Sequence, residues 1–216
     1  MKSQAEPPTP RERYRDVLRR AILDAARVEF VRYGYDGVSM RKLAERVGCS
    51  HGNLYLHFKD KAALFDCLVE ESYEQFAEAL GRVPESVKRG DPVKFLRLAG
   101  RAYVEFGLAN ASVYEFVFML RRPEQKRART PHFTYERMRS LVQRCVDEKR
   151  FRPMDVDAAS QVLWSAAHGI TSLLILRSSF PWADRDKLIG QVIDAAVDSL
   201  LPESRAGRRR APLSPR

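Results

Sequence analysis

An all-α fold is predicted for this 216-residue chain by three observations. Apolar residues recur at spacings of three and four along most of the chain, as they do on one face of a helix. The alternation of apolar and polar residues that marks a strand is missing. Glycines and prolines mostly fall between the helical patterns, where they end helices. We therefore expect an N-terminal three-helix helix-turn-helix domain followed by a helical ligand-binding and dimerisation domain.

The first helix is predicted from about Arg11 to Tyr33, after a Pro-rich segment, residues 1–10, that we expect to be disordered. Its apolar positions follow helical spacing: Leu18, Ile22, Ala25, Ala26 and Phe30. Gly34 is expected to stop this helix, because glycine readily adopts the backbone conformation that ends one.

Two short helices follow. Ser39 caps the second helix, which buries Met40, Leu43, Ala44 and Val47 and ends at Gly48. Ser50 caps the third helix, which runs from His51 to about Phe58. Leu54 and Phe58 must face inward, which leaves an outward face made of His51, Gly52, Asn53, Tyr55 and His57. Two short helices joined by a glycine turn form a helix-turn-helix, whose second helix enters the major groove of DNA.

The remaining elements are also helical. Asp60 caps a fourth helix from about Lys61 to Leu80, which buries Leu64, Phe65, Leu68, Val69 and Phe76. Further helices are expected at about residues 92–108, 112–120, 131–149, 156–178 and 184–201, before a loose basic tail at 203–216. We place the domains at residues 11–60 and 61–202.

The run SMRKLAERVGCSHGNLYLHFKDKAALF resembles the DNA-binding domain of the TetR family of regulators, and the similarity extends over residues 11–80. This resemblance implies that Tyr55 and Lys61 bind DNA phosphates and that Ser39 and Arg41 open the second helix at the backbone. It also implies a base-reading surface made of Ser50, His51, Asn53 and His57. The family usually has small or Thr-like residues where His51 and Asn53 stand, so the base preference does not carry over.

Each of these residues also has a plainer interpretation. Tyr55, His51 and His57 could be ordinary surface residues. Lys61 could be an ordinary lysine of a first helical turn, although a cation is unfavourable at a helix N-terminus.

In the C-terminal half, LWSAAHGITSLL, ANASVYEFVF and RFRPMDVDAA resemble the Trp-His-Gly-type branch of the same family. Trp164 and His168 share one helical face. We expect them to line an effector pocket with Tyr103, Phe106, Tyr114 and Phe118, as small-molecule sites are concave and largely apolar. The alternative is a well-packed core in which His168 is hydrogen-bonded to a neighbour.

Small residues around Gly169 and an apolar stripe on the last helix predict a homodimer interface, because small side chains let helices approach closely. We assign to it Ala166, Gly169, Leu188, Val192 and Ala195.

The formal charge of +10 and pI of about 9.8 suit a polyanionic partner. Positive charge also gathers in residues 121–152: Arg121, Arg122, Lys126, Arg127, Arg129, Arg137, Arg139 and Arg144. We interpret this block as a solvated loop and helix face; the alternative is a surface that binds an acidic ligand or the DNA backbone. The three cysteines have no pairing motif, so we expect free thiols and not a redox sensor. Free thiols in turn favour a cytoplasmic location. No uninterrupted apolar run is long enough to span a bilayer.

We expect no cofactor and no metal, since phosphate loops, nucleophile elbows and paired-cysteine motifs are missing. The sequence thus favours a regulator released from double-stranded DNA by a small-molecule effector. The alternatives are an architectural DNA-binding protein without a ligand and, least favoured, an enzyme.

Overall fold

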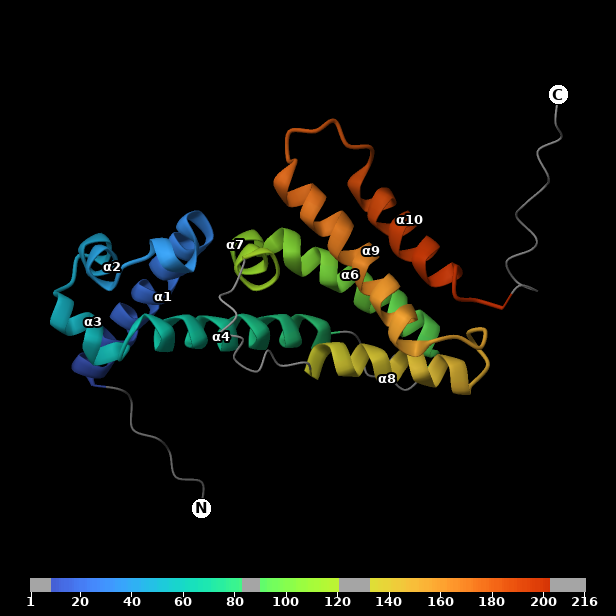
Figure 1. Ribbon diagram of the computed structural model, residues 1–216, viewed down its shortest axis with the longest axis horizontal. Coiled ribbons are helices and arrows are strands. Elements are labelled where there is room, and N and C mark those ends of the chain that lie inside the picture. Colours follow the sequence, from blue (N-terminus) through green and yellow to red (C-terminus); the bar gives the residue numbers. More distant parts are fainter. Residues whose placement is uncertain (1–8, 83–89, 121–132, 203–216) are drawn as a thin grey trace, which may run out of the picture. The chain divides into compact units, whose positions relative to one another are not determined.

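The computed structural model describes residues 9–82, 90–120 and 133–202, and every regular element in these ranges is a helix (Figure 1). The predicted all-α class is confirmed for this part of the chain. The described residues form two compact units, the first from 9–73 and 112–120, the second from 74–82, 90–111 and 133–202. The predictions of disorder at the N-terminus and of a loose tail at 203–216 fall on residues outside the described ranges, residues 9 and 10 excepted.

Helix α1 (Pro10–Gly37) opens with a complete capping box. The backbone N–H of Thr9 donates to the Glu12 carboxylate at 2.7 Å, and the N–H of Glu12 donates to Thr9 Oγ1 at 3.3 Å. Gly34 takes φ 71° and ψ 173°, so the helix breaks there and continues for one more turn. Gly34 therefore interrupts the helix as predicted, and one more helical turn follows it as far as Gly37.

Helices α2 (Met40–Val47) and α3 (His51–His57) have the predicted caps. Ser39 Oγ accepts from Lys42 N–H at 3.2 Å, and Ser50 Oγ accepts from Asn53 N–H at 3.1 Å. Gly48 has φ 76°, and its N–H reaches the carbonyls at the end of α2. Glycine is suited to this left-handed conformation, which turns the chain sharply between the two helices.

Helix α4 (Lys61–Gly81) begins at Asp60, whose Oδ1 accepts from the N–H of Ala63 at 2.8 Å. The first unit is held by an aromatic cluster. The Phe30 and Phe65 rings meet edge to face at 5.1 Å, and Phe116 lies 5.0 Å from Phe65. Phe30, Phe65 and Phe116 are at most 1% exposed, so distant parts of the sequence share one core.

The segment that carries Phe116 differs from the prediction. One regular helix was expected over 112–120, whereas α7 (Ala111–Tyr114) leads into a π-helical turn, η1 (Glu115–Met119). The N–H of Leu120 donates to Glu115 O at 2.9 Å, which is the i to i+5 pattern. Apolar spacing over so few residues fits both helix types, so the sequence pattern could not distinguish them.

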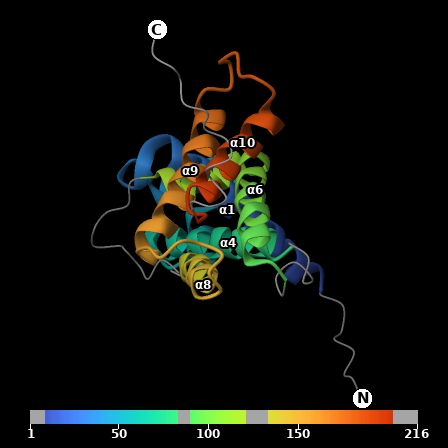
Figure 2. The ribbon, with the colours of Figure 1, turned by 90° about the vertical axis from the view of Figure 1, so that its right-hand side faces the viewer.

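The second unit contains α6 (Pro92–Ala109), α8 (Phe133–Asp147), α9 (Val156–Leu176) and α10 (Arg185–Asp198). Helix α9 packs against the other three, and Figure 2 shows α6 and α10 beside it. The buried cluster at one end of this unit is apolar: Val93, Leu96, Val142, Cys145, Phe151, Ala159, Leu163, Val197 and Leu200. These helices agree with the predicted ones to within a few residues at each end.

Helix α4 contributes to both units, so the compact units do not divide at residue 60. The boundary between residues 60 and 61 remains a prediction about which residues serve DNA binding.

Helix α9 is the one described helix that is long and apolar enough to cross a membrane, with a mean hydropathy of 1.3. Uninterrupted apolar runs did not reveal it, because polar residues and a glycine interrupt its apolar residues. The helix buries seven residues among its neighbours, including Leu163, Ile170 and Leu174. Such packing is typical of a core helix.

Candidate nucleic-acid interface and ligand-binding residues

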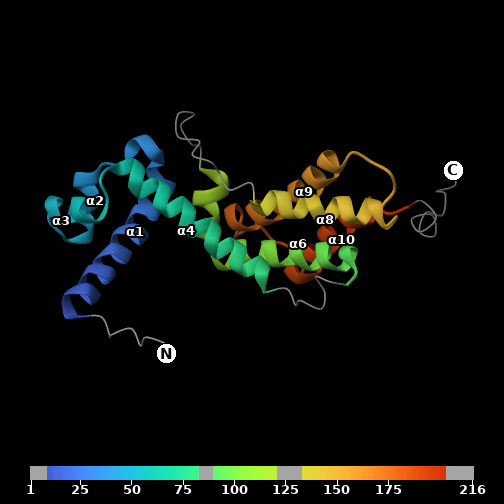
Figure 3. The same cartoon turned by 90° about the horizontal axis from the view of Figure 1, so that it is seen from below.

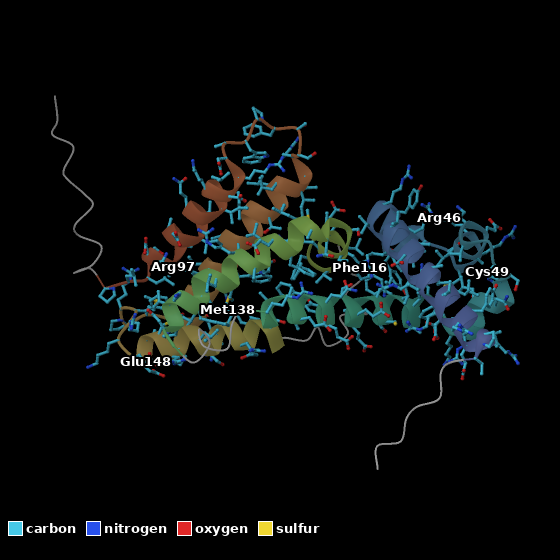
Figure 4. The ribbon with its side chains drawn as sticks, turned by 180° about the vertical axis from the view of Figure 1, so that it is seen from behind. Arg46, Cys49, Arg97, Phe116, Met138 and Glu148 are labelled. Atoms are coloured by element: carbon cyan, nitrogen blue, oxygen red, sulfur yellow. The ribbon has the colours of Figure 1, made fainter. Side chains whose placement is uncertain are left out.

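Helix α3 is fixed to the first unit by two apolar anchors. Leu54 is fully buried, and Phe58, at the C-terminal end of the helix, is 4% exposed. Figure 3 shows α1, α2 and α3 together in this unit. Arg46 of α2 forms an ion pair with Glu29 of α1, and Figure 4 labels Arg46 and the turn residue Cys49. Leu54 and Phe58 therefore fix the inward side of the short helix and leave its other side to solvent.

The outward face of α3 carries the predicted residues. His51, Asn53 and Tyr55 are exposed, and His57 is half-buried. The His51 and Tyr55 rings meet edge to face with centroids 4.7 Å apart, so each restricts the other's rotamers. Amide and imidazole groups can hydrogen-bond base edges, and a phenol suits phosphate oxygens.

Sequence reasoning missed Leu56. This side chain is 83% exposed, the highest value among the large apolar residues that are exposed. The signal was available in the helical spacing, because position 56 lies well away from Leu54 and Phe58 around the helix axis. Its apolar character argued for burial and hid it.

Three other candidates open the two short helices. Ser39 and Ser50 are exposed, and both side chains act as N-caps. The Arg41 guanidinium is exposed and donates to the Glu45 carboxylate at 3.1 Å. Arg41 is therefore partly neutralised by its own helix before any partner arrives.

Lys61 is bound more firmly than the sequence suggested. Its Nζ donates to the carbonyl oxygens of Tyr35 and Val38, at 3.0 Å each, and lies 4.5 Å from the centre of the Tyr35 ring. The ammonium thus ties the start of α4 to the α1–α2 turn, which explains a cation at a helix N-terminus. An ammonium has three donors, so one N–H is left for a phosphate.

Arg27 is an unexpected occupant of the first unit's interior. The residue is 7% exposed; its Nε and Nη2 have no hydrogen-bond partner in the described part of the chain, and Nη1 lies 3.5 Å from Asp24 Oδ1. Burial lowers its pKa, against the opposing charge of Asp24. A buried donor without a partner costs about 1–3 kcal/mol.

The three cysteines are free. Burial raises the pKa of the Cys145 thiol to about 12. Burial also raises the pKa of Cys67, although Arg19 Nη2 lies 2.9 Å from its sulfur and opposes the shift. Reactive cysteines have lowered pKa values, so both thiols fit the predicted unreactive role.

In the second unit, three predicted ligand-binding residues lie together. Trp164 Nε1 donates to Tyr103 Oη at 3.3 Å, and that oxygen lies 3.5 Å from His168 Nδ1. Tyr103 is buried, while Trp164 is 42% exposed. Burial lowers the pKa of His168, which favours the neutral imidazole.

Two aromatic residues missed in the sequence complete this group. The Phe76 ring lies 5.2 Å from Tyr103 and 5.3 Å from Phe106, and Tyr135 lies 6.2 Å from Trp164. Both lie at the ends of helices that are distant from α9 in the sequence, so no local spacing linked them to it. We define the Trp164 cluster as Phe76, Tyr103, Phe106, Tyr135, Trp164 and His168.

The remaining two candidates belong to the first unit. The Tyr114 and Phe118 rings lie 4.9 Å apart, and Phe118 also meets Tyr73 at 6.2 Å. Their assignment to the same pocket as Trp164 stays a prediction.

None of the predicted dimer residues is buried within the single chain. Ala195 is exposed, and the others are half-buried: Ala166, Gly169, Leu188 and Val192. A Cβ placed on Gly169 would meet no other described atom within 4 Å. Gly169 therefore does not serve close packing inside the chain, and the space beside it is open to a partner.

Basic residues of the 121–152 region lie partly outside the described residues: Arg121, Arg122, Lys126, Arg127 and Arg129. On α8, Arg139 pairs with Asp157 at 2.6 Å and Arg144 pairs with Glu148 at 2.6 Å. These pairs fit a solvated surface.

Figure 4 labels Glu148, together with Arg97 of α6, which binds Asp194 and Asp198 of α10 at 2.8 and 2.5 Å.

Comparison with known proteins places family patterns on both halves of the chain. The model of bacterial regulatory proteins of the tetR family matches residues 22–68. The model of the tetracyclin repressor-like C-terminal domain matches residues 96–200.

Among similar proteins is the HTH-type transcriptional repressor Rv1474c of Mycobacterium tuberculosis, 45% identical over 64 residues that cover 30% of this chain and 34% of that repressor. The HTH-type transcriptional repressor AcnR of Corynebacterium diphtheriae is 42% identical over 62 residues, 29% of this chain and 33% of AcnR. The chain thus matches about a third of the length of these relatives.

A solved bacterial regulatory protein of the tetR family from Rhodococcus RHA1 shares the fold. Its TM-score is 0.69 at 19% identity, over 85% of this chain and 96% of that one.

Proposed function

Because the chain belongs to the tetR family of bacterial regulatory proteins, we propose that it is a transcriptional repressor that binds a palindromic DNA operator as a homodimer and is released by a small, largely apolar molecule. The observation that carries this proposal is the outward face of α3. It presents His51, Asn53 and Tyr55 to solvent from a helix anchored by Leu54 and Phe58. A repressor is proposed because relatives that are similar over about 30% of this chain are named transcriptional repressors.

The proposed contacts divide into gripping and reading. Tyr55, Lys61, Ser39 and Arg41 grip phosphates, whereas Ser50, His51, Asn53 and His57 read base edges. Phosphate contacts carry no sequence information, so Tyr55→Phe should weaken binding to every duplex alike. Asn53→Ala or His51→Ala should change which bases are tolerated, with a loss of about 1–3 kcal/mol at the base concerned.

The experiment is in vitro selection of the operator, followed by binding titrations on the selected duplex and on single-base variants. If the wild-type protein bound the selected duplex and its variants with the same affinity, the proposal would be contradicted. If Tyr55→Phe changed the base preference, the division into phosphate-binding and base-contacting residues would be wrong.

Leu56 extends the reading surface. An apolar side chain in the major groove contacts the methyl group of thymine. We expect Leu56 to contact one thymine in each half-site. Replacing this thymine by uracil should weaken DNA binding by the wild-type protein and leave DNA binding by the Leu56→Ala variant unchanged. Equal losses for both proteins would remove Leu56 from the reading surface.

The homodimer is proposed on the outward side of α9 and α10, through Ala166, Gly169, Leu188, Val192 and Ala195. From Ala158 to Leu176 the sequence has no charged residue, although Val162, Leu173 and Leu176 are exposed in the single chain. A surface of this composition suits a protein partner. A two-fold dimer would present two copies of α3 to half-sites one helical turn apart.

The effector is proposed to enter at the Trp164 cluster, where the Tyr103 hydroxyl links an indole N–H and an imidazole. Binding there would lower DNA affinity by favouring a second conformation, with a coupling of about 1–3 kcal/mol. Compounds should be screened for release of wild-type protein from its operator. Trp164→Ala and Phe118→Ala should then still bind DNA but respond at different compound concentrations.

If both variants responded as wild type does, the pocket would lie elsewhere. If no compound released the protein, the architectural alternative would be favoured.

A further inference from the structure

The first three turns of α1 protrude from the buried part of the first unit. Ile22 is the first buried residue of the helix, and Tyr14 and Val17 are 65% and 68% exposed. We call residues 10–20 the α1 extension. The tetR family model matches residues 22–68, so the extension precedes the stretch that this model covers.

The extension is helical because of its own sequence. Thr9 and Glu12 form the capping box, and Pro10 occupies the first turn, where its missing N–H removes no hydrogen bond. Eleven residues of helix are about 16 Å long. Local capping therefore stabilises the first turn of this helix, where no residue is buried.

The extension is strongly basic. It contains five arginines and two acidic residues. Arg19 and Arg20 are occupied, since both donate to the Glu71 carboxylate at 3.1 Å. Within the described ranges no acidic side chain forms an ion pair with Arg11, Arg13 or Arg15, and the Glu12 carboxylate is held by Thr9.

The extension lies next to the C-terminal end of α3. The Arg19 guanidinium stands 5.3 Å from the centre of the Phe58 ring. The pKa of His57, the last residue of α3, is lowered first by burial and then by the positive charges of Arg15 and Arg19. Of the three unpaired arginines, Arg15 is therefore a neighbour of the proposed reading surface, and Arg11 lies one turn before it on the same side of the helix.

We propose that the α1 extension is a second DNA-contacting element, whose Arg11, Arg13 and Arg15 bind backbone phosphates flanking the sequence read by α3. This inference rests on the proposed function. Exposed, unpaired guanidinium groups beside a recognition helix complement the phosphate backbone, and such contacts strengthen binding without selecting bases. Counterion release makes the contribution salt-dependent.

The test compares full-length wild type with the triple variant Arg11→Gln/Arg13→Gln/Arg15→Gln. The matched control, Lys94→Gln/Arg152→Gln/Lys187→Gln, removes the same charge from exposed positions of the second unit. Glutamine and arginine have similar helix propensities, so the extension should stay helical, which circular dichroism checks. Affinity for the selected operator is measured between about 50 and 200 mM salt.

Each lost phosphate contact should reduce the slope of log affinity against log salt by about 0.9, hence by up to about 5 for the six arginines of a dimer. The triple variant should bind at least tenfold more weakly at the lowest salt, with an unchanged base preference. The control should match wild type. Arg11→Lys/Arg13→Lys/Arg15→Lys should restore most of the slope, since an ammonium also binds phosphate.

A second arm uses two duplexes, one cut at the edges of the half-sites and one with about ten flanking base pairs on each side, roughly one helical turn. The longer duplex should improve wild-type binding and leave the triple variant unchanged. Equal slopes for wild type and the triple variant would overturn the inference. Failure of wild type to select any duplex would instead refute the proposed function.

Discussion

The outward faces of α3 and α9 differ in chemistry although both are exposed in the single chain. Helix α3 exposes His51, Asn53 and Tyr55, which can donate or accept hydrogen bonds, and beside them the apolar Leu56. Helix α9 exposes Val162, Leu173 and Leu176 within a stretch that has no charged residue. Exposure alone therefore does not identify a partner. The polar face suits a hydrated groove lined with phosphates, whereas the uncharged apolar face suits a second protein surface.

The interiors of the two units differ as well. In the second unit the buried Ser160 and Thr171 donate to helix carbonyls four residues earlier, at 2.7 Å each. In the first unit the buried Arg27 leaves two nitrogens without a partner among the described residues. Among the described residues, the first unit therefore carries an internal cost that the second does not.

The largest effect is expected when a charge is placed on the exposed apolar face of α9. Leu173→Glu adds a carboxylate that dimerisation would bury without a partner, at a cost of about 3–5 kcal/mol. Sedimentation velocity should show monomers, and operator affinity should fall with dimerisation.

Ser140→Glu is the matched control, because it adds the same charge on α8 at an exposed position. A Leu173→Glu protein that remained dimeric would exclude this face as the interface.

A substitution of Gly169 should have opposite effects on the stability of the single chain and on that of the dimer. Gly169→Leu meets open space within the chain, so it should raise the chain's own helix stability by up to about 1 kcal/mol. In the dimer the added volume should overpack the interface and cost about 1–3 kcal/mol. The dimer dissociation constant and the urea unfolding of the isolated monomer at low concentration measure the two effects separately.

Gly169→Ala serves as the control, since it gives most of the helix gain with little added volume. An unchanged dimer constant for Gly169→Leu would remove Gly169 from the interface.

The contrast between the two interiors is tested by Arg27→Met. Removing the unpaired donors while keeping an unbranched apolar side chain should raise the free energy of unfolding by about 1 kcal/mol. Arg41→Met, at an exposed position, should change it by less than about 0.5 kcal/mol. Urea unfolding monitored by circular dichroism gives both values. Destabilisation by Arg27→Met would show that the guanidinium has a stabilising partner.

The smallest expected effect concerns pH. Burial lowers the pKa of His168 in the folded chain, while the unfolded chain keeps a value near 6.5. Below that value the unfolded state binds more protons, so the free energy of unfolding should decrease as pH falls from about 7 towards about 5. His168→Gln should flatten this decrease in urea titrations at several pH values. A steeper decrease in the variant would contradict the neutral, buried imidazole.

The helix-turn-helix was predictable because its signals are local. Ser39, Gly48, Ser50 and Asp60 take the predicted roles, since caps and a left-handed glycine act over four or five residues. The burial of Leu54 and Phe58 follows from their four-residue spacing. The α7–η1 segment was less predictable, because its short apolar pattern fits both an α and a π turn.

The sequence by itself thus determined the all-α class, the place of the short, outward-facing helix α3 and the small-residue stripe on α9. Only the tertiary structure decided that Lys61 bonds to the Tyr35 and Val38 carbonyls, that Arg27 is buried, and that Phe76 and Tyr135 join Trp164. The reason is physical. Caps and helical periodicity depend on neighbours within about one or two turns, whereas these contacts join residues that only folding brings together.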